Sequence, residues 1–246
     1  MSIDKQTKNI HAGHRERLKE RIKRMDMSEV DDLYFLEQLL TYSIPRADTN
    51  PIAHRLLKEF KTIDNIFEAD ERALQEIAGV GPRTVYFLKY MLMVCYKYNK
   101  AKATKTTFVG TYATLTKFLR GIIPPSHTEQ IAVLCLNKNF EVKNYTVLKG
   151  VNHSLAPINT EEIINYLTKN KFPCCIIAHT HPEGSANPSS ADMDAFVNLK
   201  KLLAKISIDL VDNIILGSGE FYSSRLQGKR TYSLVDGDDT QNSYKG

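Results

Sequence analysis

The spacing of hydrophobic residues divides the chain into a helical first half and a mixed second half. From about residue 13 to residue 100, apolar side chains recur every three or four positions, which places them on one face of an α-helix. The pattern is clearest at Leu18, Ile22, Met25, Leu33, Leu36, Leu39 and Leu40. A further helix is predicted to begin at Pro51, since polar capping candidates precede it and proline is favoured at the first helical position. We expect this half to be all-α.

The pattern changes after residue 107. Short, β-prone apolar runs at residues 131–137 (IAVLCLN) and 174–179 (CCIIAH) predict strands, and the segments TEEIINYLTKN and DMDAFVNLKKLLAKI predict helices. The Lys/Ala/Thr-rich run at residues 97–107 is the expected linker. A chain of 246 residues favours two compact units. We therefore predict an α+β, two-domain protein: a helical domain at residues 1–103, a mixed α/β domain at residues 104–236, and a flexible polar tail at residues 237–246.

Composition adds three expectations. The chain is 42% hydrophobic and 25% charged, as globular proteins are and disordered ones are not. Its first residues lack the apolar core of a signal peptide, and no later apolar run is long enough to span a membrane, which predicts a cytoplasmic protein without a membrane partner. The four cysteines have no CxxC spacing and lie in apolar segments, so we expect buried, reduced thiols at Cys95, Cys135, Cys174 and Cys175.

Charge is only weakly informative about a partner. The first 105 residues carry 19 basic and 15 acidic side chains, and the remainder carries 14 and 13. Such a surplus permits contact with nucleic-acid phosphates, yet it is common in proteins that bind none. Residues 15–24 include six basic side chains, but Glu16 and Glu20 alternate with them, as on an ordinary solvated helix.

The segment AHTHPEGSANPSSADMDAF contains the residues of a candidate metal site. His179 and His181 are two apart at the end of a predicted strand, so their side chains share a face. A turn rich in Gly, Pro and Asn follows, and Asp192 stands where a helix begins. Two neutral imidazoles and a carboxylate suit one zinc ion, and three protein ligands leave the fourth position open, as in catalytic sites. Ser189 and Asp192 also fit a capping box, a role that is compatible with metal binding.

A hydrolytic zinc site needs a general base. The ion lowers the pKa of a bound water to roughly 7, and a side chain must then accept the proton. Glu129 is the preferred candidate because it stands at the start of a predicted core strand, while Glu161 and Glu162 are competitors. Zinc deaminases use His-x-Glu followed by Pro-Cys-x-x-Cys, and no Pro-Cys-x-x-Cys occurs in this chain, which disfavours base deamination.

At these residues the chain resembles the JAMM (MPN-type) metalloproteases, whose motif is His-x-His, seven residues, Ser, two residues, Asp. The longer segment HTHPEGSANPSSAD is similar to the bacterial RadC family, with matches at Pro182, Gly184, Pro188 and Ser189. The segments RERLKERI, GVG and DLVDNIILGSGEFYS follow in the family's order, so the resemblance covers nearly the whole chain. Departures are Thr180, where the family often has asparagine, and Asn213 after Asp212, where a histidine is common.

The resemblance implies a JAMM/MPN domain related in fold to the cytidine deaminases. It further implies one zinc ion per chain on His179, His181 and Asp192, with Glu129 as the base. In the same comparison Ser189 supports the tetrahedral intermediate through a hydrogen bond. A protein or peptide is the expected substrate.

The glycine-rich connection in LQEIAGVGPRTVYFLK resembles a helix-hairpin-helix motif. Gly79, Val80 and Gly81 would form the hairpin, and Arg83 and Lys89 would contact the phosphate backbone of DNA, independently of base sequence. The same Gly-x-Gly connection is also found as a plain turn between packed helices.

Three functions follow from these features. The leading hypothesis is a zinc-dependent hydrolase of peptide or isopeptide bonds that a helix-hairpin-helix domain brings to DNA. The second is a DNA-binding or scaffold protein with an idle or structural metal site. The third, a metal-dependent nuclease, is disfavoured because a single metal without further carboxylates does not make a two-ion site. The sequence does not predict the oligomeric state.

Overall fold

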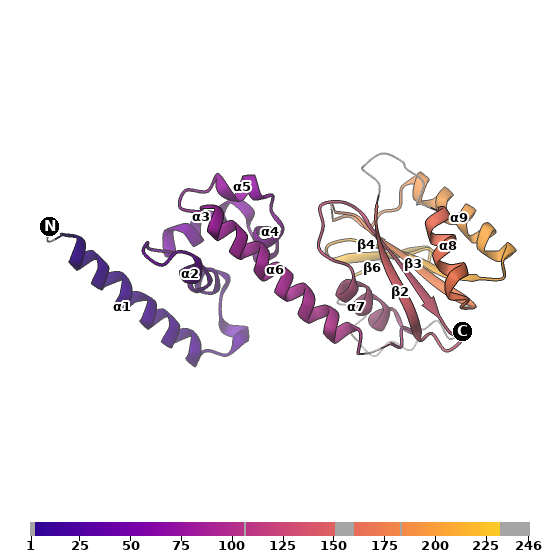
Figure 1. The fold of residues 1–246 in the computed structure, drawn as a ribbon, viewed down its shortest axis with the longest axis horizontal. Helices are drawn as coiled ribbons and strands as arrows, with labels where there is room; N and C mark the ends of the chain where they lie inside the picture. Colours follow the sequence, from indigo (N-terminus) through magenta and orange to yellow (C-terminus); the bar gives the residue numbers. More distant parts are fainter. Residues whose placement is uncertain (1–2, 106, 151–159, 183, 232–246) are drawn as a thin grey trace. The chain divides into compact units, whose positions relative to one another are not determined.

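The computed structural model describes residues 3–105, 107–150, 160–182 and 184–231. Two compact units divide the chain, Met1–Cys95 and Tyr96–Gly246. The first is helical and the second contains a mixed sheet with helices, as predicted (Figure 1). The predicted tail at residues 237–246 lies outside the described residues. Within the part of the chain that is described, no helix is both long and apolar enough to cross a membrane.

The first unit is built from helices around one apolar core. Its elements are α1 (Ile3–Arg24), the 3-10 turn η1 (Met27–Glu29), α2 (Asp32–Ser43), α3 (Asn50–Phe60), α4 (Ile63–Glu68), α5 (Glu71–Gln75) and the first part of α6 (Pro82–Ala103). The predicted helix at Pro51 is present, with proline in its first turn. The largest fully buried side chains of this core are Leu36, Leu40, Leu56, Ile66, Leu74 and Leu88.

The basic segment of α1 is fastened to the end of α2. The Arg15 guanidinium donates to the backbone carbonyls of Ile44, Pro45 and Ala47, which lie at and just beyond the end of that helix. His14 contacts the Glu37 carboxylate at 2.6 Å, and Glu37 is itself only 1% exposed. At least part of this basic run therefore stabilises the fold, a role that the sequence pattern left open.

Two features of the middle of the chain differ from the expected ones. Residues 97–103, expected as part of the linker, are helical, because α6 continues to Ala103, and the two units divide directly before them, between Cys95 and Tyr96; the lysines and alanines of this run are good helix formers. Cys95 is exposed rather than buried, because an apolar sequence context does not specify which side of a helix faces the core. The three other cysteines are buried and all four are free thiols, as expected.

The second unit contains a six-stranded sheet with strand order β2-β1-β3-β4-β5-β6. Its helices are α7 (Tyr112–Ile122), α8 (Thr160–Asn170) and α9 (Ser190–Lys205), and its strands are β1 (Gln130–Leu136), β2 (Val142–Lys149), β3 (Cys174–Thr180), β4 (Asp209–Leu216), β5 (Glu220–Ser223) and β6 (Gly228–Thr231). Neighbouring strands are antiparallel except β3 and β4, which are parallel and joined through α9. The predicted strands and helices of this half are present.

Helices cover both faces of this sheet (Figure 1). Alternate residues of β1 and β3, such as Leu134 and Ile176, pack with α7 in one apolar cluster. The residues between them, such as Val133 and Ile177, pack with α8 and α9 in another. All seven residues of β1 are therefore buried, which explains why this strand reads as a continuous apolar run rather than an alternating one.

Candidate metal centre

The end of β3 positions the two histidines. His179 belongs to the strand and is opposite Ile131 of β1 and beside Ile215 of β4. His181 lies one residue beyond the strand, where its backbone N–H still donates to the carbonyl of Leu216 at 3.0 Å. The extended backbone thus places both imidazoles on one face, as predicted, and their Nε2 atoms are 3.2 Å apart.

The first turn of α9 brings the carboxylate to the histidines. Ser189 is the N-cap: the N–H of Asp192 donates to its Oγ, and both the N–H and the hydroxyl of Ser189 donate to Oδ2 of Asp192. This is the predicted capping box. Because Oδ2 accepts these bonds, Oδ1 of Asp192 remains directed at Nε2 of His179, 3.5 Å away. Capping and metal binding are therefore compatible in this structure.

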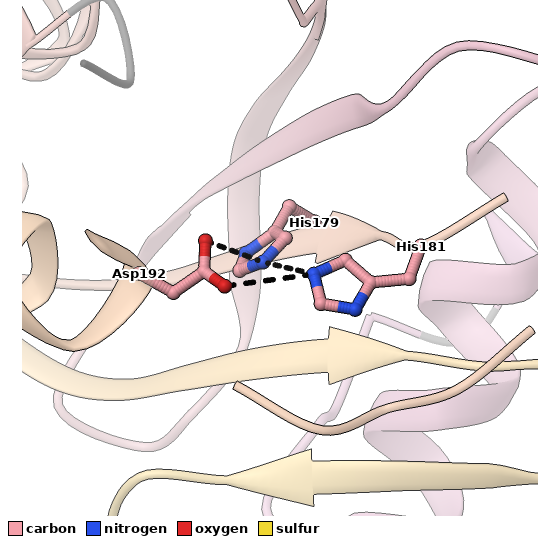
Figure 2. Close-up of side chains that lie close together, drawn as sticks. All are labelled: His179, His181 and Asp192. Carbon is pink, nitrogen blue, oxygen red and sulfur yellow. Dashed lines mark hydrogen bonds and ion pairs between the residues drawn. The ribbon is translucent and has the colours of Figure 1, made fainter. Parts of the chain in front are cut away.

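The separations of the three side chains fit a single metal ion (Figure 2). The Nε2 atoms lie 3.2 Å apart, and they lie 3.5 and 3.7 Å from the carboxylate oxygens of Asp192. Ligand atoms at 2.0–2.2 Å from a tetrahedral zinc ion are roughly 3.3–3.6 Å from one another. Among the described residues, these three form the only group of histidine, cysteine or carboxylate side chains that could hold a metal ion.

Burial keeps one of the histidines neutral. His179 is 3% exposed, and this burial, partly opposed by the Asp192 carboxylate, lowers the pKa of His179 to about 4. For Asp192, burial alone would raise the pKa, but the hydrogen bonds from Ser189 and the two histidines together lower it. A neutral imidazole and an ionised carboxylate are the protonation states in which both groups bind a divalent metal.

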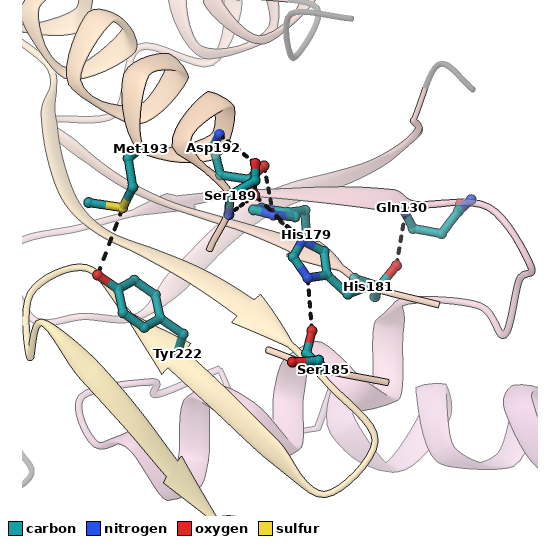
Figure 3. A network of polar contacts seen from close by, with 9 residues as sticks. Gln130, His179, His181, Ser185, Ser189, Asp192, Met193 and Tyr222 are labelled. Atoms are coloured by element: carbon teal, nitrogen blue, oxygen red, sulfur yellow. Dashed lines mark hydrogen bonds and ion pairs between the residues drawn. The ribbon is translucent and has the colours of Figure 1, made fainter. Parts of the chain in front are cut away.

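The two imidazoles differ in how they are oriented. Nδ1 of His181 lies 2.8 Å from the carbonyl oxygen of Ser185 (Figure 3). A carbonyl only accepts, so Nδ1 must carry the proton, and Nε2 of the neutral ring presents a lone pair to the cluster. Nδ1 of His179 is buried and has no hydrogen-bond partner among the described residues. His179 is therefore oriented by packing rather than by a hydrogen bond at that nitrogen.

The turn between the second histidine and α9 is fastened to the end of β4. Gly184 has a φ of +90°, a conformation that favours glycine. Its N–H donates to the carbonyl of His181, and its carbonyl accepts from the N–H of Ser218. Ala186 is fully buried beside Ile215 and Tyr222. These contacts hold the turn in place beside the metal cluster.

The structure places Glu129 on the face of the histidines but not in contact with them. It directly precedes β1, and its carbonyl accepts from Gly150 N–H at 2.7 Å, so strand pairing continues at this residue. Alternation along the strand puts Glu129 on the same face as Ile131, which is opposite His179. The side chain is exposed and lies outside the three-residue cluster. Glu161 and Glu162 are exposed in the first turn of α8, also outside it.

The two departures from the family pattern lie close to the site in the sheet. The hydroxyl of Thr180 accepts from the N–H of Gln130 at 3.0 Å, which ties the end of β3 to the start of β1 (Figure 3). Asn213 is buried in β4 beside Ile177. Its neighbour Asp212 is fully buried and accepts hydrogen bonds from the hydroxyls of Tyr112 and Ser223, so that carboxylate supports the fold.

The predicted DNA-binding residues lie in the first unit, at the connection between α5 and α6. Gly79 has a φ of +95°, and a Cβ atom at this position would lie 2.8 Å from the Ile52 side chain. Gly81 has open space around it, and Arg83 is exposed. Lys89 makes contacts within the unit: its ammonium group donates to the carbonyls of Phe67 and Ala69 at the end of α4.

The basic surplus of the first half does not lie in the helical unit. Its 15 basic residues up to Cys95 equal its 15 acidic ones. The surplus comes from four lysines that belong to the second unit: Lys97, Lys100, Lys102 and Lys105. Charge therefore does not favour the helical unit as a phosphate-binding surface.

One residue near the site was missed by the sequence reasoning. Glu220, at the start of β5, accepts a hydrogen bond from the N–H of Ala186, in the turn that carries His181. The two residues are 34 positions apart, and no motif spacing connects them. The only sequence signal for this contact is that the segment GSGEFYS directly follows β4.

Comparison with known proteins agrees with this geometry. Residues 104–229 match the family described as RadC-like JAB domain. The chain is 30% identical over 223 residues to UPF0758 protein FN0909 of Fusobacterium nucleatum, an alignment that covers 88% of this chain and 96% of that protein. It is 27% identical over 217 residues to UPF0758 protein SPO0054 of Ruegeria pomeroyi, covering 87% and 96%. Neither name states an activity.

Proposed function

The chain belongs to the RadC family, which carries a JAB domain, and on that premise we propose that it is a zinc-dependent hydrolase of peptide or isopeptide bonds. The observation that carries the proposal is the convergence of His179, His181 and Asp192 at distances that suit one ion. Three protein ligands in the described part of the chain leave a tetrahedral ion one position for chemistry, the arrangement of catalytic rather than structural zinc.

The proposed mechanism assigns one task to each residue. When bound, the ion supplies a Lewis acid that makes water nucleophilic near neutral pH and polarises the scissile carbonyl. The Glu129 carboxylate accepts the proton of the attacking water and delivers it to the leaving nitrogen as the carbon–nitrogen bond breaks. Its exposed position at the strand end lets it reach a substrate on the histidine face. The Ser189 hydroxyl donates a hydrogen bond to the Asp192 carboxylate. It can donate to a substrate oxygen only if this hydrogen bond breaks.

Two finer structural assignments belong to the same proposal. The sheet with helices on both faces, and its metal cluster at the end of β3, support an MPN-type fold related to the cytidine deaminases. The turn at Gly79 and the open surroundings of Gly81 support a helix-hairpin-helix motif that contacts DNA through Gly79, Val80, Gly81 and Arg83. The balanced charge of the first unit makes this second assignment the weaker one.

Metal analysis tests the site. Wild-type protein purified with zinc should retain one equivalent, whereas His179→Ala, His181→Ala and Asp192→Ala should each lose it. His127→Ala is the matched control, because His127 is an exposed histidine outside the cluster. Unchanged metal content in the His179→Ala and His181→Ala variants would refute the site.

Activity then separates the three functions. A panel of peptides and isopeptides is incubated with the zinc-loaded protein and with Glu129→Gln, which should keep the ion, stall turnover and trap bound partners. Hydrolysis that needs both zinc and Glu129 supports the proposal. No hydrolysis, together with duplex binding that Gly81→Asp or Arg83→Glu abolishes, supports the scaffold function. Cleavage of labelled single-stranded, duplex or branched DNA would instead identify a nuclease.

A further inference from the structure

A single peptide group lies between one proposed metal ligand and a carboxylate from another strand. The carbonyl of Ser185 accepts from Nδ1 of His181 at 2.8 Å, as Figure 3 shows. The N–H of the same peptide group, that of Ala186, donates to Oε1 of Glu220 at 3.2 Å. The Ser185–Ala186 peptide group therefore connects the Glu220 carboxylate to the His181 imidazole through two hydrogen bonds.

The backbone holds this arrangement in place on the Glu220 side and at Ala186. Glu220 begins β5, where its backbone pairs with Thr231 of β6, and its carboxylate makes an exposed ion pair with the ammonium group of Lys229, 3.0 Å from Oε1. The bond with Lys229, followed by that from Ala186, lowers the pKa of Glu220. Ala186 is fully buried in a cluster with Ile215 and Tyr222. The peptide group therefore has little freedom to turn away from either partner.

We propose that Glu220 is a positioning residue for the metal centre, acting on His181 through the Ser185–Ala186 peptide group. By accepting the Ala186 N–H, it holds the Ser185 carbonyl against Nδ1 and keeps the proton of His181 on that nitrogen. Nε2 then presents its lone pair to the ion. The inference rests on the proposed metal site, and it names a residue outside the ligand set that supports that site.

The chemistry favours a role beyond loop stability. A peptide group that donates to a carboxylate becomes a better acceptor at its carbonyl, because hydrogen bonds in a chain polarise one another. An imidazole whose Nδ1–H is held by such an acceptor is fixed in ring orientation and tautomer, and becomes a more basic ligand. Among the described residues, Nδ1 of His179 has no such partner, so of the two histidines only His181 is oriented by a hydrogen bond at Nδ1.

Zinc affinity, measured by competition with a chromophoric chelator, tests the first half of the proposal. Glu220→Ala should weaken zinc binding roughly 10-fold, the lower end of the effect seen when a partner of a ligand is removed. Glu220→Gln retains an oxygen acceptor for the Ala186 N–H and should restore most of the affinity. Lys229→Met removes only a solvent-exposed ion pair and should stay close to the wild type. Circular dichroism verifies that each variant is folded.

The tautomer of His181 in the metal-free protein tests the second half. Long-range 15N–1H NMR correlations should show the proton on Nδ1 in the wild type and in Glu220→Gln, and a mixture of tautomers in Glu220→Ala. A merely structural role would leave this signature unchanged.

Three results would overturn the proposal: unchanged zinc affinity in Glu220→Ala, an unchanged tautomer in that variant, or an equal loss of affinity in Lys229→Met. If the wild type binds no zinc, the proposed function fails, and the tautomer comparison alone decides the role of Glu220.

Discussion

Ser189 determines which oxygen of Asp192 faces His179. Its hydroxyl and its N–H donate to Oδ2 at 2.7 and 2.8 Å, while Oδ1 lies 3.5 Å from Nε2 of His179. The same contacts begin helix α9. One residue thus serves the stability of the helix and the geometry of the proposed metal ligand, and these two effects can be separated by experiment.

Ser189→Ala should lower both stability and metal affinity. Loss of the cap costs about 1 kcal/mol of unfolding free energy, and loss of the bond to the carboxylate should weaken zinc binding roughly 10-fold. Urea denaturation and chelator competition measure the two effects. Ser189→Thr keeps the hydroxyl and should restore both. An alanine variant that loses stability but binds zinc like the wild type would show that the cap alone explains this residue.

The start of β1 should be sensitive to crowding at Gly150. A Cβ atom there would lie 2.7 Å from the carbonyl oxygen of Glu129 and 2.8 Å from its Cβ atom. Gly150→Ala should therefore displace Glu129 and reduce hydrolysis of whichever substrate the panel identifies, while zinc content is unchanged. Glu129→Gln should reduce turnover roughly 10²–10⁴-fold.

Gly219 provides the control for this experiment, because a Cβ atom at that position meets nothing within 4 Å. Gly219→Ala should keep wild-type turnover. If Gly150→Ala and Glu129→Gln both remain fully active, the base lies elsewhere, and Glu161 and Glu162 become the residues to substitute.

Only one of the four cysteines should react with iodoacetamide in the native protein. Cys95 is exposed, whereas the other three are buried. Burial raises the pKa of Cys135 to about 11 and also raises the pKa of Cys174 and Cys175, so these thiols stay protonated near neutral pH. The thiolate is the reactive form. Mass spectrometry should find one modified thiol before unfolding and four after it.

Cys95→Ser should abolish labelling of the native protein. Modification of Cys135, Cys174 or Cys175 at the rate of Cys95 would contradict the burial of the strands that carry them.

The parts of this molecule that the sequence predicted are those that local patterns encode. Short, β-prone apolar runs identified β1 and β3. The ligands lie within fourteen residues of one another, so the alternation of side chains along a strand and one turn were enough to bring them together. The capping box was likewise readable, because its two members are one helical turn apart.

No local sequence pattern predicted the contacts between segments that are distant in the chain. Glu220 reaches Ala186 only because β5 folds back beside β4, and Arg15 reaches Ala47 only because α1 packs on α2. The continuation of α6 to Ala103 was missed because a Lys/Ala-rich run reads as polar linker, although its intrinsic helix propensity is high. The face on which Cys95 lies depends on packing that its neighbours in sequence do not specify.

Lys89 and Arg83 lie in the same helix but should respond differently to substitution. The Lys89 ammonium binds the carbonyls of Phe67 and Ala69, and burial lowers its pKa, so Lys89→Met should lower the stability of the helical unit by roughly 1–3 kcal/mol. Arg83 is exposed, so Arg83→Glu should change stability by less than about 0.5 kcal/mol. If the helical unit contacts DNA, Arg83→Glu should weaken duplex binding strongly.

Urea titration followed by helical circular dichroism, and duplex binding measured at two salt concentrations, separate these outcomes in the full chain. When a cationic side chain that contacts a phosphate is replaced, the duplex affinity depends less steeply on salt concentration. A Lys89→Met variant of unchanged stability, with duplex affinity reduced as much as in Arg83→Glu, would return Lys89 to the phosphate-binding role that the sequence first suggested. Stability loss without such a change would establish that its carbonyl contacts hold α4 against α6.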